Sequence, residues 1–201
     1  IKVKNGGVDF TVNIKNKGSY DARLNVLGEH NVRNALVAIA VAERHGIEVT
    51  EAIKALAGYE GVSMRQQITD VNGVTIIDDS YNASPDSMKA GIDVLCDYNN
   101  NGRKIAVLAD MLELGDKSAD YHKEVGGYMA EKKIDELILF GTMAANIGDC
   151  FNGSYKLFKK REEINEYLLK NLKSGDAILF KGSRGMKLNE CVDFLKENYN
   201  G

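Results

Sequence analysis

The sequence has 201 residues, of which 44% are hydrophobic, so it can bury a core in one large domain or in one domain and part of another. Its 26 basic and 29 acidic residues are interspersed and give a formal net charge of -3 at pH 7, which leaves no basic stripe for a nucleic-acid partner. Three widely separated cysteines argue against a disulfide framework or a zinc site and favour reduced thiols in the cytoplasm, and no apolar run approaches the roughly 20 residues of a membrane span.

The first 27 residues have the pattern of short strands. Val8, Phe10, Val12 and Ile14 alternate with polar residues, as expected for strands that bury one face. Turn signals stand at residues 5–7, which read Asn-Gly-Gly, and at residues 17–18, which read Lys-Gly.

Two helical patterns follow. From residue 31 to residue 45, we expect a helix whose core face carries Val32, Leu36, Ile39 and Ala40, with Gly46 as its C-terminal cap. A second, shorter helix fits residues 50–57, with Thr50 as the N-cap and Gly58 at its end.

Residues 58–63 read GYEGVS, with two glycines and no periodicity. Segments of this kind often connect domains. We therefore predict one domain, or part of one, over residues 1–62 and a second domain over residues 63–201.

The second part of the chain alternates strand and helix patterns. Asn72-Gly73 predicts a tight turn between strands at residues 66–71 and 74–79. Further strand-like runs at residues 104–109, 136–140, 155–158 and 176–181 are separated by helical patterns. One such helix begins at Ser84 as N-cap and Pro85. The alternation predicts an α/β fold with a mostly parallel sheet and flanking helices.

Polar segments follow three of these strands: DDSYN from Asp78, DMLELG from Asp110 and KGSRG from Lys181. In open α/β sheets, ligands usually bind beyond the carboxyl ends of the strands, so these segments are candidate ligand loops. The alternative is that they are ordinary solvated loops, because Asp, Ser and Asn commonly cap helices.

Three further residues are candidates for nucleotide binding. Asn31 and Asn34 stand near a helix start, and their amides offer the donor and acceptor that an adenine edge requires; Asn31 could equally be an N-cap. Arg65 could stabilise a transferring phosphoryl group, or it could be a surface arginine. There is no G-x-x-x-x-G-K-[ST] loop and no metal-ligand histidine spacing, so we assign no metal to these residues.

Taken in order, several motifs resemble those of the Mur ligase family: GEHNVRNA (28–35), SMR (63–65), DDSYNASPDSM (78–88), VLADMLELG (107–115), YHKEVG (121–126) and KGSRGMK (181–187). The resemblance implies that residues 1–62 are the C-terminal part of a central ATP-binding domain. Residues 63–201 would form a C-terminal, Rossmann-like ligase domain. The phosphate-binding loop and most magnesium ligands would lie upstream of Ile1. The resemblance therefore implies that this chain is an incomplete fragment, which we do not expect to be active alone.

The resemblance also implies roles for single residues. Asn31 and Asn34 would contact adenine, Asp79 the ribose, and Arg65 the phosphates as a catalytic residue. The candidates for the substrate carboxylate or the acyl intermediate are Asn82, Ser183, Arg184 and Asp110.

The implied activity is ATP-dependent, magnesium-dependent amide ligation in peptidoglycan precursor synthesis. A monomer in the cytoplasm would join D-alanyl-D-alanine to UDP-N-acetylmuramoyl-tripeptide through an acyl phosphate. Two alternatives stay open: another Mur-type or folylpolyglutamate-type amino-acid ligase, and a non-catalytic α/β module that binds a nucleotide or peptide.

Overall fold

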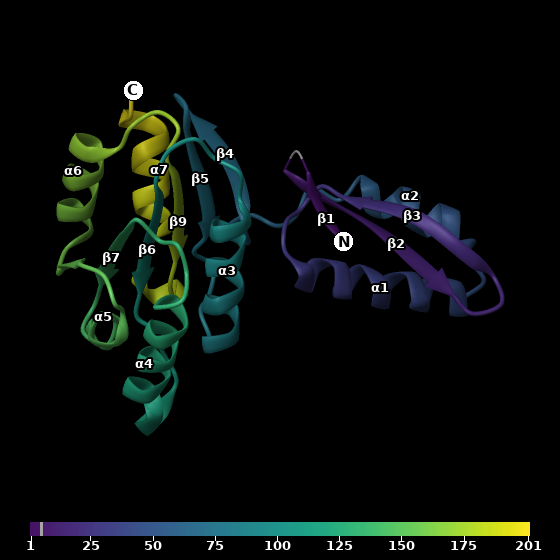
Figure 1. Cartoon of the computed structure of the whole chain (residues 1–201), viewed down its shortest axis with the longest axis horizontal. Helices are drawn as coiled ribbons and strands as arrows, with labels where there is room; N and C mark the ends of the chain where they lie inside the picture. The colour runs from purple at the N-terminus through teal and green to yellow at the C-terminus, as the bar shows by residue number, and fades with distance from the viewer. Residues whose placement is uncertain (5) are drawn as a thin grey trace. The chain divides into compact units, whose positions relative to one another are not determined.

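The computed structural model of the chain describes residues 1–4 and 6–201, with the side chains of Val3 and Lys4 left aside. Asn5, the first residue of the predicted turn at residues 5–7, lies outside the described residues. The chain forms two compact units, Ile1–Val62 and Ser63–Gly201, drawn from purple to blue and from teal to yellow (Figure 1). What each unit does in a longer protein stays a prediction.

The first unit contains an antiparallel sheet in the order β1-β2-β3. Its strands are β1 (Lys2–Lys4), β2 (Gly7–Ile14) and β3 (Gly18–Leu24). The predicted alternation is confirmed, since Val8, Phe10 and Val12 are buried. The turn predicted at residues 17–18 joins β2 to β3, and Gly18 has a φ of 106°, which favours glycine.

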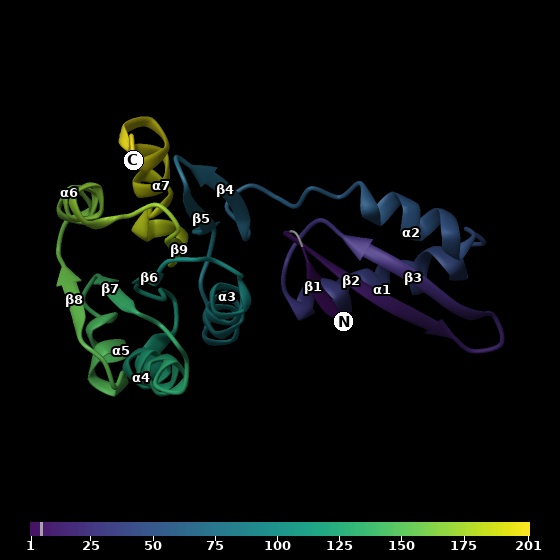
Figure 2. The same ribbon diagram turned by 45° about the horizontal axis from the view of Figure 1, so that its top comes forward.

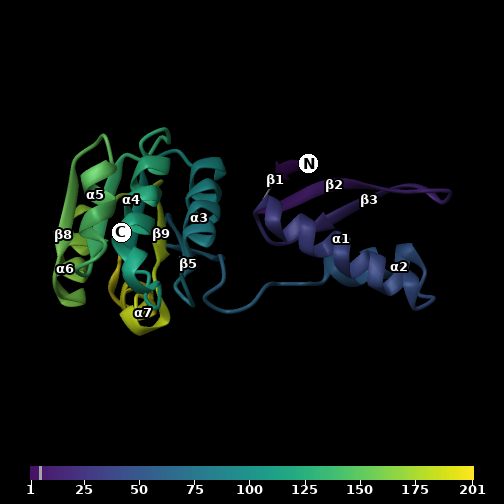
Figure 3. The same cartoon turned by 90° about the horizontal axis from the view of Figure 1, so that it is seen from below.

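Helices α1 (Glu29–Arg44) and α2 (Val49–Ala57) pack against each other and against this sheet (Figure 3). The core face of α1 was predicted only in part. Val32 and Ile39 are buried as expected, but Ala35 completes the stripe, while Ala40 is exposed and Leu36 is 41% exposed. The helix is apolar on more than one side, so periodicity alone could not tell which side meets the sheet.

The ends of these helices also differ from expectation in one respect. Helix α2 begins at Val49, and its N-cap is Glu48 without a side-chain cap, so the prediction that Thr50 is the N-cap is wrong. Burial of Val49 inside the unit accounts for the earlier start, because packing overrides a weak capping preference. At the end of α1, Gly46 follows the C-cap with a φ of 80°, as predicted.

The second unit is built on a six-stranded sheet in the order β4-β5-β9-β6-β7-β8 (Figure 2). The strands are β4 (Gln67–Val71), β5 (Val74–Asp79), β6 (Lys104–Ala109), β7 (Glu136–Phe140), β8 (Tyr155–Phe158) and β9 (Ala177–Lys181). Among the described strands of this sheet, β4 and β5 form the only antiparallel pair, and the other neighbouring strands are parallel. The predicted α/β class with a mostly parallel sheet is confirmed.

The β4–β5 hairpin turns at the predicted dipeptide. Asn72 and Gly73 have φ angles of 49° and 84°, the left-handed pair that a two-residue hairpin turn requires. The Asn72 amide also donates to the carbonyl oxygen of Tyr199 at 2.6 Å. The turn is thereby attached to the end of the last helix.

Helices cover both faces of the sheet. Helices α3, α4 and α5 lie on one side, and α6 and α7 lie on the other (Figure 2). They span α3 (Pro85–Asp97), α4 (Ser118–Met129), α5 (Ala145–Cys150), α6 (Arg161–Asn171) and α7 (Asn189–Asn198). Ser84 caps α3 and Pro85 is its first residue, as predicted. The short helix α5 was not predicted.

The chain order of the strands determines where a ligand can bind. The connections through α3, α4 and α5 lead from β5 to β6, β7 and β8, whereas α6 leads back to β9 between β5 and β6. The loops after β5, β9 and β6 therefore leave three neighbouring strands at the same edge. A reversal of strand order of this kind is where open α/β sheets bind ligands.

In the described part of the chain, no helix has the length and apolar character that crossing a bilayer requires.

Candidate ligand-binding sites

Buried polar side chains gather at the carboxyl edge of β5, β9 and β6. They are Asp78, Asp79, Ser80, Asp110, Lys181 and Ser183. Burial of polar groups is costly unless each finds a partner, so the partners define what the edge can do.

Lys181, at the end of β9, forms an ion pair with Asp79, at the end of β5. The Lys181 Nζ lies 2.7 Å from the Asp79 Oδ2, and it also donates to the carbonyl oxygen of Asn82 at 3.1 Å. Lys181 is only 2% exposed. A Cβ at Gly91 of α3 would lie 2.9 Å from the Lys181 Cδ, so the glycine leaves room for the lysine. Lys181 thus connects two predicted ligand residues, although the sequence did not single it out.

The loop after β6 is held by Asp110. Its Oδ1 accepts from the backbone N–H of Ala144 at 2.6 Å, and its Oδ2 accepts from that of Thr142 at 3.1 Å. The carboxylate also lies against Gly141, where a side chain would collide with it. These contacts favour a positioning role for Asp110 over the predicted substrate contact, because its charge is already stabilised by backbone donors.

Two more side chains fix the same loop. The backbone N–H of Met111 donates to the His122 Nε2 at 2.9 Å, while the His122 Nδ1 donates to the carbonyl oxygen of Ser118 at 2.7 Å. The imidazole must therefore be the neutral tautomer protonated at Nδ1. His122 is fully buried, and sequence reasoning missed it because its partners are backbone groups.

Ser183 ties the loop after β9 to the loop after β6. Its Oγ accepts from the backbone N–H of Leu112 at 2.8 Å, and its own N–H donates to the carbonyl oxygen of Asp110 at 3.1 Å. Within the described ranges, no protein acceptor takes the Ser183 hydroxyl proton. That proton can be donated to a carboxylate ligand.

Exposed side chains surround these buried groups. Tyr81 and Asn82 follow β5, and Arg184 follows Ser183. The guanidinium carbon of Arg65 lies 4.4 Å from the centre of the Tyr81 ring, and the Arg184 Nη1 lies 2.7 Å from the Met64 sulfur. The structure thus brings two buried residues, Asp79 and Ser183, to one edge of the sheet. It brings four exposed residues to the same edge: Arg65, Tyr81, Asn82 and Arg184.

The first unit has a separate hollow of about 210 Å³. It is lined by Leu24, Val26, Asn31, Asn34, Ala35, Ala38, Leu56 and Tyr59. Two amides among apolar and aromatic side chains suit a flat heterocyclic ring. The volume is smaller than that of pockets that enclose a whole drug-sized ligand, so it fits one ring of a nucleotide.

The structure excludes one of the two interpretations of Asn31, its role as an N-cap. Helix α1 begins at Glu29, and its N-cap is Gly28 with a φ of 95°. The Asn31 amide donates to the carbonyl oxygen of Leu27 at 2.7 Å. Asn31 is therefore not an N-cap, and its own carbonyl oxygen can accept from a ligand.

Magnesium fits the described residues less well than a nucleotide ring does. Across residues 1–4 and 6–201, no three His, Cys, Asp or Glu side chains come together in a way that could hold a metal ion.

An open α/β sheet with polar loops at its switch point, and a ring-sized hollow beside two asparagines, are features that α/β proteins use to bind small polar ligands. Comparison with known proteins narrows this class. Residues 64–184, more than half of the chain, match the Mur ligase, glutamate ligase domain. The chain belongs to the Mur ligase family, as its motifs predicted.

Relatives match along most of the chain. The UDP-N-acetylmuramoyl-tripeptide–D-alanyl-D-alanine ligase of Bacillus subtilis is 41% identical over a 182-residue alignment that covers 86% of this chain and 39% of that protein. The ligase of the same name from Haemophilus influenzae is 34% identical over 200 residues, 95% of this chain and 42% of that protein. The chain thus spans about two fifths of the length of these relatives.

Solved structures of proteins from the same family resemble this chain along most of its length. MurF from Acinetobacter baumannii superposes with a TM-score of 0.87 at 30% identity, over 96% of this chain and 43% of that one. MurF from Thermotoga maritima, solved in complex with ADP, gives a TM-score of 0.84 at 25% identity, over 98% of this chain and 45% of that one. The roles of individual residues in this chain stay predictions.

Proposed function

We propose that this chain is part of a cytoplasmic, ATP-dependent amide ligase that joins D-alanyl-D-alanine to UDP-N-acetylmuramoyl-tripeptide. The observation that carries the proposal is the convergence of three polar loops on the neighbouring strands β5, β9 and β6. Relatives named for this reaction match along most of the chain.

In this proposal, the first unit is the C-terminal part of an ATP-binding domain. The hollow beside Asn31 and Asn34 receives the adenine ring, with amides meeting its polar edge. The family resemblance assigns the ribose hydroxyls to Asp79 of the second unit, whose carboxylate forms an ion pair with Lys181. When bound, ATP supplies the phosphoryl group that activates the substrate carboxylate.

The second unit binds the incoming dipeptide. The amide of Asn82, the hydroxyl of Ser183 and the guanidinium of Arg184 are the donors available to a carboxylate. Holding the dipeptide by its carboxylate orients its amine for attack. Arg65 is placed to stabilise negative charge on the transferring phosphoryl group, because a guanidinium stays charged and offers several donors.

The test is phosphate release by a full-length ligase that contains this chain. With ATP, magnesium, UDP-linked tripeptide and D-alanyl-D-alanine present, we expect release that stops when either of the last two is omitted. Release that instead requires another amino acid would assign the chain to a sister ligase. No release under any combination would contradict a ligase and favour a binding module.

A second measurement uses this chain alone. Calorimetric titration with ATP should show little or no binding, because the described residues offer a ring hollow without a phosphate-binding loop. Tight ATP binding by the isolated chain would favour a complete nucleotide-binding module.

A further inference from the structure

We propose that Tyr81 is a positioning residue for Arg65: its ring holds the guanidinium at the carboxyl edge of the sheet. The inference rests on the proposed function only for the role of Arg65, which is to stabilise negative charge on the transferring phosphoryl group. The positioning itself is a property of the second unit and can be measured without catalysis.

The contact is a cation–π interaction. The guanidinium carbon of Arg65 lies 4.4 Å from the centre of the Tyr81 ring, well within the distance at which such pairs attract. Across the described residues, no carboxylate pairs with the Arg65 guanidinium. The ring of Tyr81 is therefore the partner that the structure gives to this charge.

A ring suits a catalytic arginine better than a carboxylate would. The ring attracts the cation through its face, so the N–H donors of the guanidinium remain available for a phosphate. A carboxylate partner would occupy two of these donors and cancel the charge. An arginine over an aromatic face is both held and free to bind an anion.

The backbone on both sides of Arg65 is shaped for this contact. Met64 and Gln66 have φ angles of 59° and 53°, the left-handed region that residues other than glycine enter at a cost. One contact offsets part of that cost: the Tyr81 N–H donates to the Met64 carbonyl oxygen at 3.1 Å. The segment of residues 64–66 is thereby held on the loop after β5.

Met64 also meets the loop after β9. Its sulfur lies 2.7 Å from the Arg184 Nη1. Met64 thus contacts one ligand loop through its carbonyl oxygen and another through its side chain. The position of Arg65 depends on both loops, so a change in either one is transmitted to the arginine.

The energetic consequence is preorganisation. A free arginine side chain loses conformational entropy when it is fixed on a ligand. Because the Tyr81 ring already restricts Arg65, less entropy is lost when the phosphoryl group arrives. The benefit appears in the rate if Arg65 acts mainly in the transition state.

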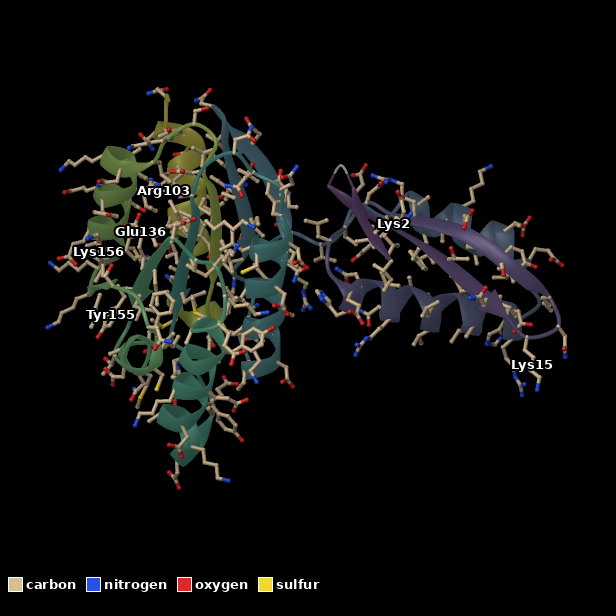
Figure 4. All side chains as sticks on the ribbon, viewed as in Figure 1. Lys2, Lys15, Arg103, Glu136, Tyr155 and Lys156 are labelled. Atoms are coloured by element: carbon tan, nitrogen blue, oxygen red, sulfur yellow. The ribbon has the colours of Figure 1, made fainter. Side chains whose placement is uncertain are left out.

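The first test is nuclear magnetic resonance on this chain. The side-chain signals of Arg65 should show an upfield ring-current shift, which Tyr81→Phe keeps and Tyr81→Leu removes. Tyr155→Leu is the matched control, because Tyr155 on the outer strand β8 is 39% exposed, close to the 42% of Tyr81 (Figure 4). Arg65 signals that are the same in Tyr81→Leu and in the unmodified chain would overturn the proposal.

The second test is catalysis by the full-length ligase. Tyr81→Leu should lower kcat about two- to fivefold, the value of an exposed cation–π pair, with little change in KM for the dipeptide or in Tm. Tyr81→Phe should retain kcat. Equal loss in both variants would mean that the hydroxyl contacts a ligand, which overturns the positioning role.

The two tests separate the two proposals. If the unmodified full-length protein has no ligase activity, the proposed function fails, whereas the Arg65 signals still decide whether Tyr81 positions the arginine.

Discussion

The two edges of the six-stranded sheet each carry an ion pair that is at least partly buried, and the pairs differ in what surrounds them. At the carboxyl edge, Lys181 pairs with Asp79. At the amino edge, Arg103 pairs with Asp176 (Arg103 is labelled in Figure 4). A buried charge therefore does not by itself mark a functional site. The groups that surround each pair distinguish the two edges.

At the amino edge, the protein itself satisfies the pair. Arg103 meets Asp176 at 2.6 Å, Glu136 at 3.0 Å and the carbonyl oxygen of Asn171 at 2.7 Å. Tyr167 donates to the other oxygen of Glu136. Burial, together with that hydrogen bond, raises the pKa of Tyr167 to about 12. The network is closed, so it stabilises the fold and has little to offer a ligand.

At the carboxyl edge, the buried pair lies beneath exposed donors. Asn82 and Arg184 stand on the loops that Asp79 and Lys181 begin. Their side chains can exchange water for a ligand at little structural cost. An open set of donors above a rigid buried pair is the arrangement expected of a binding site.

The largest effect is expected from Lys181→Met. The change breaks the buried ion pair between Lys181 and Asp79, which should lower the free energy of unfolding by about 3–5 kcal/mol. Urea denaturation of this chain would measure it. Adding Asp79→Asn removes the negative charge of the pair as well, and the double variant should regain part of the loss; no regain would mean that the ion pair is not the cause.

A smaller loss is expected from Arg103→Met at the opposite edge. Because the Arg103 side chain is 34% exposed, we expect about 2–3 kcal/mol, below the range for a fully buried pair. Arg103→Lys keeps the charge but loses the forked geometry, so its free energy of unfolding should lie between those of Arg103→Met and the unmodified chain. Ligase activity of a full-length protein, measured well below the unfolding temperature, should not change. A fall in kcat would contradict the division between the edges.

The amino-edge pair also predicts a pH dependence. Burial alone would raise the pKa of Asp176, but hydrogen bonds from the Arg103 side chain and from the backbone N–H groups of Arg103 and Lys173 lower it below its usual value. A lowered native pKa contributes stability above about pH 4 that is lost as the pH falls further. The stability difference between the unmodified chain and Arg103→Met should therefore shrink below about pH 4. Urea titrations at pH 7, 5 and 3.5 would show a constant difference if Asp176 were not involved.

The smallest effect is expected from Ser84→Ala, at the start of α3 beside the carboxyl edge. Ser84 accepts from the backbone N–H of Ser87 and caps the helix. Loss of such a cap costs about 1 kcal/mol, which thermal unfolding would detect. Ser84→Asp should preserve stability, because its carboxylate can take over the cap; a loss equal to that of Ser84→Ala would show that the hydroxyl has another role.

Much of the fold was predictable because the signals are local. The alternation in β2, the dipeptide Asn72-Gly73 and the cap at Ser84 each depend on neighbouring residues only. The face of α1 that is buried and the six-residue helix α5 were not predictable, because they depend on packing against distant segments.

The candidate site was predicted in its loops and only partly in its internal contacts. The motifs identified Asp79, Asn82, Ser183 and Arg184, which the structure places on adjacent loops. Lys181 contacts Asp79 and Asn82 across the sheet, and His122 of α4 contacts the backbone of the loop after β6. No spacing in the sequence encodes such pairs. Whether the predicted residues bind the predicted ligands stays a prediction.

The position of β9 has a consequence for how the second unit folds. This strand comes last along the chain, yet it lies in the middle of the sheet between β5 and β6. Until it arrives, the β4–β5 hairpin and the three strands β6, β7 and β8 cannot join, and each part presents an unpaired strand edge. Pairing β5 with β9 closes a loop of nearly the whole unit, so we expect slow folding. During synthesis, the β4–β5 hairpin and strands β6 to β8 keep unpaired edges until β9 is made, and they are prone to aggregate until it pairs.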